Sequence, residues 1–160
     1  MNTPPATRTP CMRTIPVLCV DPLEEDPVVL QEIFGSSPWG MCPDSLWKLQ
    51  TSRSLTSAWR ALHTHRFPLI LCERDLQPGT WRELLDLIER LPQPPFLVVT
   101  SRAADERLWA EALNLGAYDV LAKPFDRTEV MRVVSMAWAH WTARHGAALE
   151  APRMAVGGAA

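Results

Sequence analysis

In the stretch "PLILCERDLQPGTWRELL", residues 68 to 85, a short apolar run ends at a carboxylate and is followed by a capped helix. The run "LILC" (69–72) is short and continuously apolar, as expected of a strand that is covered on both faces. Thr80 and Glu83 then form a T-x-x-E capping box in front of an apolar helical face. The stretch therefore predicts a strand followed by a helix, with Glu73 at the end of the buried strand.

The same alternation of apolar runs and helical patterns extends in both directions from this stretch. Further strands are predicted at 15–20, 46–50, 96–99 and 119–122, and helices at 26–34, 54–65, 80–91, 103–116 and 126–141. Alternating strands and helices of this kind indicate βα units and a parallel sheet. The sequence thus predicts one α/β domain with a doubly wound five-stranded sheet, in which 46–50 is an edge strand carrying a lysine.

Composition and charge restrict the classes of function. The chain has 160 residues, 16 basic and 18 acidic side chains and a net charge of -2, so it lacks a basic field for nucleic acid or an anionic membrane. Its apolar runs are far shorter than the ~20 residues that a membrane-spanning helix needs. Four cysteines without metal-site spacing are expected to be buried thiols. We expect a cytoplasmic protein with a domain over 14–141 and flexible tails at 1–13 and 142–160.

Polar side chains follow four of the predicted strands. Asp21 follows the first strand, Glu73 the third, Thr100 the fourth and the pair Lys123-Pro124 the fifth. The carboxyl ends of the strands form the functional edge of a doubly wound sheet, so these groups are expected to meet there. A glycine-rich phosphate loop is missing after the first strand, and the acidic run "DPLEED" would repel a phosphate. A nucleotide or flavin protein is therefore the disfavoured alternative.

The run "VVTSRAADERLWAEALNLGAYDVLAKPF", residues 98 to 125, resembles the receiver domain of bacterial two-component response regulators. The likeness lies in the hydroxyl residue Thr100, the "LGA" turn at 115–117 and the "KPF" signature at 123–125, and it extends over about residues 14–141. It implies the flavodoxin-like (βα)5 fold with strand order 2-1-3-4-5. It also implies a cis peptide bond between Lys123 and Pro124, which is seen in only ~5% of such bonds in general.

In that family an aspartate after the third strand accepts a phosphoryl group from a histidine kinase. A metal ion is held by this aspartate and by an acidic pair after the first strand, and the hydroxyl residue and the lysine bind the phosphoryl oxygens. Asp21, Thr100 and Lys123 match these positions. Pro22 stands in place of the second acid and Glu73 in place of the phosphoacceptor, so the resemblance implies a pocket that departs from the family pattern.

These two departures have physical consequences. The extra methylene of Glu73 moves the carboxylate outward by about 1.5 Å, and a misplacement of ~1 Å can cost about 10²-fold in a positioned reaction. Asp21 and Glu73 remain as metal ligands, so Mg²⁺ binding is expected to be weakened. Replacement of the lost ligand by Glu24 or Glu25 is the less favoured alternative. Glu73 would either form a half-buried ion pair with Lys123 or imitate the phosphorylated state through that contact.

The sequence therefore predicts a stand-alone, atypical receiver that is not an enzyme and acts as a protein-binding signalling module. The alternative is a phosphorylatable receiver that uses Glu73 or Asp75 as its phosphoacceptor. The expected partners are a histidine kinase or a downstream effector, or a second copy that docks on the face formed by 103–116, 119–122 and 126–141. Trp109 and Met131 are the interface candidates on that face, and Val120 occupies the position of the family's switch aromatic.

Overall fold

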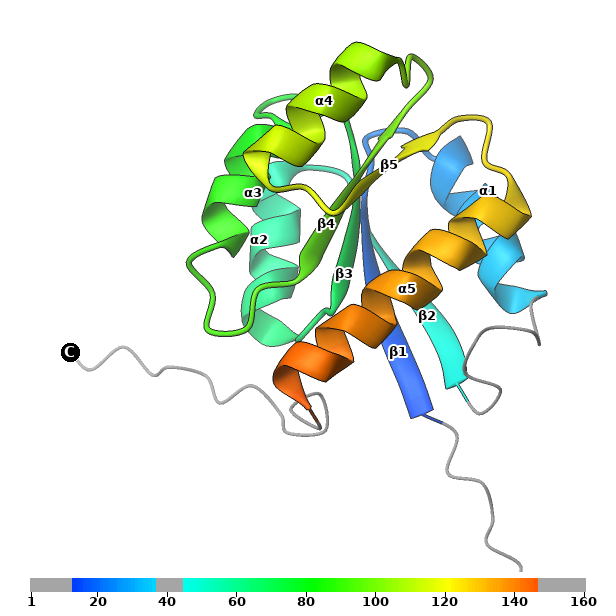
Figure 1. Cartoon of the computed structure of the whole chain (residues 1–160), viewed down its shortest axis with the longest axis vertical. Coiled ribbons are helices and arrows are strands. Elements are labelled where there is room, and N and C mark those ends of the chain that lie inside the picture. Colours follow the sequence, from blue (N-terminus) through cyan, green and yellow to red (C-terminus); the bar gives the residue numbers. More distant parts are fainter. Residues whose placement is uncertain (1–12, 37–44, 147–160) are drawn as a thin grey trace, which may run out of the picture.

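A computed structural model describes residues 13–36 and 45–146 of the chain. Five parallel strands form one sheet in the order β2-β1-β3-β4-β5 (Figure 1). The strands are β1 (Arg13–Val20), β2 (Ser45–Ser52), β3 (Leu69–Glu73), β4 (Phe96–Ser101) and β5 (Asp119–Ala122). The predicted fold class and strand order are confirmed, and β2 lies at an edge of the sheet as expected.

Five helices cover the two faces of the sheet. They are α1 (Glu25–Gly35), α2 (Leu55–Thr64), α3 (Trp81–Ile88), α4 (Glu106–Leu115) and α5 (Arg127–His145). Helices α2, α3 and α4 pack on one face, and α1 and α5 pack on the other (Figure 1). Residues alternate along β3, where Ile70 and Cys72 face the first layer and Leu69 and Leu71 the second. The unbroken apolar strands of the sequence therefore result from burial on both sides.

Helices α3 and α5 begin where the sequence places their caps. Thr80 Oγ1 accepts a hydrogen bond from the Glu83 N–H at 3.2 Å, and Asp126 Oδ1 accepts one from the Glu129 N–H at 2.9 Å. At the other end of a helix, Gly116 has a φ of 104° and terminates α4 in the left-handed region, which glycine adopts without steric cost. These local signals fix the positions of the loops that carry the polar side chains.

The helix boundaries differ from the prediction by up to four residues, and α3 ends and α4 begins three residues inside the predicted ranges. Helix α1 begins at Glu25, one residue before the expected start, and α5 continues to His145, four residues beyond the expected end. The last turns of α5 are held because Trp141 is 1% exposed and its Nε1–H donates to the Pro94 carbonyl at 3.1 Å. Most of the two predicted tails lies outside the described residues.

The core contains the apolar side chains that the helical spacing assigned to it. Trp81, Trp138 and Trp141 are all buried. Cys19 and Cys72 are buried free thiols, and burial raises the pKa of Cys19 to about 12, so these two cysteines act as small apolar residues. The other two cysteines lie outside the described part of the chain. Among the described residues, none of the helices is long and apolar enough to span a membrane.

Candidate functional site

The polar side chains predicted to meet at the carboxyl edge of the sheet do lie together there. Thr100 pairs in register with Glu73 across β3 and β4, and Lys123 follows β5 with its backbone N–H donating to the Ser101 carbonyl at 2.9 Å. Asp21 follows β1, where its N–H donates to the Ser52 carbonyl of β2 at 2.9 Å. All four side chains are buried. The sheet register therefore builds a compact polar site from four separate loops.

The centre of this site is the Lys123 ammonium. Nζ donates to Asp21 Oδ2 at 2.9 Å and to Asp26 Oδ2 at 2.7 Å, and a third, short contact joins it to Glu73 Oε2. A lysine has three N–H donors, so each of them is directed to a different carboxylate. Asp21, Asp26, Glu73 and Lys123 together are called the carboxylate-lysine pocket below.

The pocket keeps its lysine charged. Burial alone lowers the pKa of Lys123, but the hydrogen bonds to Asp26, Glu73 and Asp21 outweigh it, so the pKa of the ammonium is raised above its usual value. The side chain is 1% exposed, and a buried ammonium is tolerated only when it is paired and hydrogen-bonded. Lys123 therefore stays protonated at neutral pH and neutralises part of the surrounding negative charge.

The second oxygens of the three carboxylates are also engaged. Asp21 Oδ1 accepts the Leu23 N–H at 2.9 Å, and Glu73 Oε1 accepts the Asp75 N–H at 3.0 Å. Asp26 Oδ1 lies 3.5 Å from Nη2 of the exposed Arg102. Each carboxylate thus has a partner on both of its oxygens.

Asp26 is the site residue that the sequence prediction missed. Glu24 and Glu25, the less favoured replacements for the acid lost at Pro22, are exposed, and Glu24 pairs with Arg53 outside the pocket. Asp26 lies in the first turn of α1 and is only 7% exposed. Its spacing to the buried Leu30 and Ile33, at i+4 and i+7, places it on the inward face of the helix. That spacing is the sequence signal from which the inward position of Asp26 could have been predicted.

The comparison with protein families identifies the class of this domain. The sequence model of the family described as "Response regulator receiver domain" matches residues 42–135. The chain belongs to this family.

Solved structures of receivers share the fold over most of the chain. The signal receiver domain of an HD domain-containing protein from Pseudomonas fluorescens Pf-5 is 26% identical, with a TM-score of 0.65, covering 82% of this chain and 99% of that one. The receiver domain of a putative LuxO repressor protein from Vibrio parahaemolyticus is 14% identical, with a TM-score of 0.71, covering 82% of this chain and 95% of that one. No curated protein matches the chain in sequence.

The acidic side chains fit the metal that receiver domains typically bind. Ligand atoms of Asp21, Asp26 and Glu73 all lie within 4.8 Å of one another, and carboxylate oxygens are the ligands that Mg²⁺ prefers. Asp26, on α1, thus places a third carboxylate beside Asp21 and Glu73. A bound Mg²⁺ would supply positive charge beside a phosphoryl group.

The remaining residues named from the sequence lie on β5, on α4 and α5 and in the loop after β3. The peptide bond between Lys123 and Pro124 is cis, as expected. Val120 is fully buried, whereas Asp75 is exposed in the loop beyond the pocket, and Trp109 is half-buried on α4. Met131 is only 8% exposed because it packs in the core between α5 and the sheet, so its choice as an interface residue was wrong.

Proposed function

We propose that this receiver is an atypical protein-binding module of two-component signal transduction that works without conventional aspartyl phosphorylation. The observation that carries the proposal is the contact between the Lys123 ammonium and Glu73, made together with Asp21 and Asp26. The lysine that would bind incoming phosphoryl oxygens already has all three donors engaged. Signalling would then depend on which partner binds the receiver, and the pocket would hold one surface conformation.

Charge and geometry support a pocket that is poorly suited to phosphoryl transfer. Catalysis of this reaction consists almost entirely of positioning and electrostatic stabilisation. A phosphoryl group carries a charge of about -1.5 to -2, and here it would enter a buried site that already holds three carboxylates around one ammonium. Mg²⁺ would have to compete with the Lys123 ammonium for carboxylate oxygens, so we propose that its binding is weakened.

Phosphorylation with a small-molecule donor tests this proposal. The wild type and the Glu73→Asp variant are incubated with acetyl phosphate and Mg²⁺, and their intact masses are measured. We expect the wild type to keep its mass and the shorter aspartate to gain a phosphoryl group, because it withdraws from Lys123 and leaves room for the donor. A phosphorylated wild type would contradict the proposal.

The alternative function is a receiver that is phosphorylated on Glu73 or Asp75. One observation favours it, since Asp75 is exposed and its N–H is bonded to Glu73, so both carboxylates lie on one short segment. If the wild type gains a phosphoryl group, Glu73→Gln and Asp75→Asn variants identify the acceptor, because only one of the two would lose the added mass.

Receivers interact with histidine kinases and effectors, and we propose in addition a homodimer through α4, β5 and α5, in the cytoplasm. With Met131 buried, the support for this face rests on α4, where the half-buried Trp109 and the exposed Leu113 stand at i and i+4. Sedimentation of the wild type and of a Trp109→Ala variant tests it. A monomeric wild type at high concentration would exclude this dimer.

A further inference from the structure

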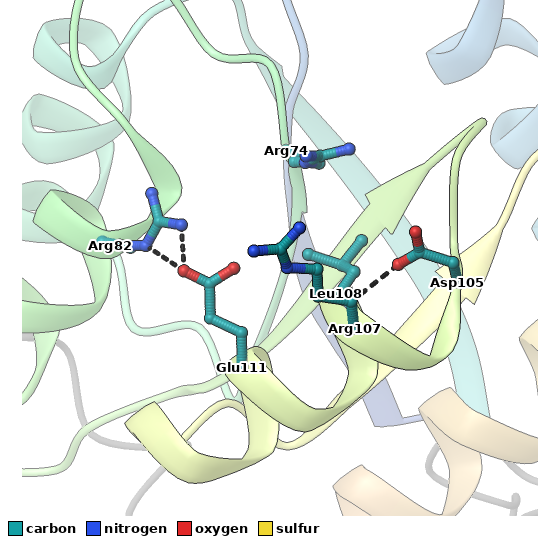
Figure 2. Close-up of a pocket in the computed structure, with 6 residues that line it drawn as sticks. All are labelled: Arg74, Arg82, Asp105, Arg107, Leu108 and Glu111. Atoms are coloured by element: carbon teal, nitrogen blue, oxygen red, sulfur yellow. Dashed lines mark hydrogen bonds and ion pairs between the residues drawn. The ribbon is translucent and has the colours of Figure 1, made fainter.

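A second charged region lies between α3 and α4, beside the loop that leaves Glu73. It is a cavity of about 560 Å³, lined by Arg74, Arg82, Asp105, Arg107, Leu108 and Glu111 (Figure 2). This region is called the arginine cavity below. It brings three guanidinium groups together with two carboxylates, and five of its six lining residues carry a charge. Its chemistry is therefore that of a site for a charged ligand.

Both carboxylates of the arginine cavity are already used within the protein. Glu111 Oε1 accepts a hydrogen bond from Arg82 Nε at 2.8 Å and makes a second, short contact with Nη2 of the same side chain (Figure 2). Asp105 caps α4, since its Oδ1 accepts the Leu108 N–H at 2.8 Å. The guanidinium of Arg82 also lies 5.1 Å from the centre of the Trp81 ring. Arg82 is thus held in place and largely neutralised.

The remaining two arginines are not neutralised. The side chains of Arg74 and Arg107 form no hydrogen bond or ion pair with any residue of segments 13–36 and 45–146, and both are exposed. Figure 2 shows the Arg107 guanidinium between the Arg82 and Glu111 pair and Arg74. Arg107 also belongs to the first turn of α4, where the helix dipole adds positive potential. Two unpaired cations therefore share one concave surface.

We propose that the arginine cavity binds a small hydrophilic anion with more than one phosphoryl charge, such as a diphosphate or a phosphorylated sugar. Guanidinium groups match the oxygens of a phosphoryl group in a two-point contact, and the volume falls in the range of roughly 300–1,000 Å³ found for small-molecule sites. Among the described residues that line the cavity, Leu108 alone is apolar, and it is buried. This polar lining favours a hydrophilic ligand over a nucleobase or a lipid chain.

The position of Arg74 connects this site to the carboxylate-lysine pocket. Its backbone N–H donates to the Thr100 carbonyl at 2.9 Å, and the next N–H along the chain, that of Asp75, donates to Glu73 Oε1. An anion held by the Arg74 side chain would therefore act on the segment that carries Glu73. This binding requires no phosphorylation of the pocket, so it stands apart from the function proposed above.

Titration with pyrophosphate tests the proposal. The full chain is titrated by calorimetry at fixed ionic strength and without divalent metal, using the wild type and the Arg74→Ala, Arg107→Ala and Arg132→Ala variants. We expect one pyrophosphate per chain, and a loss of affinity of about tenfold for each of the first two variants, because each removes a charge-assisted contact. Arg132 is exposed on α5, on the opposite face of the sheet, so its removal should leave the affinity unchanged.

Nuclear magnetic resonance locates the site in the same titration. The amide signals of Arg74 and Leu108 should shift with pyrophosphate, and those of α5 should not. Equal affinities in the wild type and in the Arg74→Ala and Arg107→Ala variants would overturn the proposal. So would tighter binding of a peptide of aspartate and glutamate than of pyrophosphate, because that result would assign the cavity to an acidic protein segment. The replaced side chains are exposed, and thermal unfolding of each variant confirms that the fold is intact.

Discussion

The carboxylate-lysine pocket and the arginine cavity lie next to each other, but they handle charge in opposite ways. In the pocket, three carboxylates and one ammonium are buried and paired with one another. In the arginine cavity, two guanidinium groups are exposed and unpaired among the described residues. A buried charge must find its partner within the chain, whereas water can solvate an exposed charge until a ligand arrives.

This difference predicts which mutations will lower stability and which will lower ligand affinity. Removing one charge from the pocket leaves the other buried charges without compensation, so the free energy of unfolding should fall. Removing one charge from the arginine cavity leaves only solvated groups, so the affinity for the ligand should fall while stability is kept. The two regions can therefore be separated by measuring unfolding and binding on the same set of variants.

The largest effect is expected for Lys123→Met. The substitution leaves three buried carboxylates without their cation, and breaking a buried ion pair on one side costs about 3–5 kcal/mol of the free energy of unfolding. Urea unfolding at neutral pH measures this loss. Mg²⁺ should restore part of it, because the metal replaces the missing positive charge. An unchanged free energy of unfolding would show that the three carboxylates do not depend on Lys123 for their charge compensation.

The only other lysine provides the matched control. Lys48 is exposed on β2, so Lys48→Met should change stability by no more than about 0.5 kcal/mol. Because the pKa of Lys123 is raised in the folded state, its contribution is complete below the unfolded pKa of about 10.4 and is lost as the pH rises through the folded value. The wild type and Lys48→Met should both show this alkaline loss of stability. Its persistence in Lys123→Met would exclude Lys123 as the source.

An intermediate effect is expected for Asp26→Asn. The change keeps the shape of the side chain but removes a charge that accepts a hydrogen bond from Lys123, at a cost of about 1–3 kcal/mol. It should also weaken Mg²⁺ binding, measured by titration of the purified protein. The control variants are Glu24→Gln and Glu25→Gln, which alter exposed acids of the same segment. A larger loss of Mg²⁺ affinity in either control than in Asp26→Asn would remove Asp26 from the site.

A smaller change in stability than for Asp26→Asn is expected for Glu111→Gln in the arginine cavity. Its ion pair with Arg82 is exposed on both sides, with 37% and 48% of the two side chains accessible, so the free energy of unfolding should change by less than about 1 kcal/mol. Pyrophosphate should bind more tightly to this variant, because Arg82 becomes available as a third cation. Weaker binding would indicate that Glu111 positions the arginines for the ligand.

Most of the fold followed from short-range sequence signals. Thr80 and Asp126 cap helices that begin at the next residue, so these caps are encoded locally. The continuous apolar runs likewise indicate strands that are buried on both faces. The meeting of Glu73 with Lys123 also followed, since parallel strands bring their carboxyl ends to one edge.

The parts that escaped prediction depend on side-chain direction in three dimensions. In the sequence, Asp26 is recognised only as the start of a helix. In the structure, the first turn of α1 directs its carboxylate at Lys123. Met131 has helical spacing that suits either a surface or a core, and the packing of α5 on the sheet decides for the core. The arginine cavity joins Arg74 to Arg107 across 33 positions of sequence, a proximity that no local pattern contains.

The unequal placement of the two lysines allows covalent labelling to measure how often the pocket opens. Amine-directed reagents attack the uncharged amine, and Lys123 is both enclosed and held in its protonated form, whereas Lys48 faces solvent. Acylation of Lys123 can therefore proceed only from molecules whose pocket has opened. The rate of labelling at this single residue, referred to that at Lys48 in the same sample, would report how often the pocket opens and whether a bound partner holds it shut.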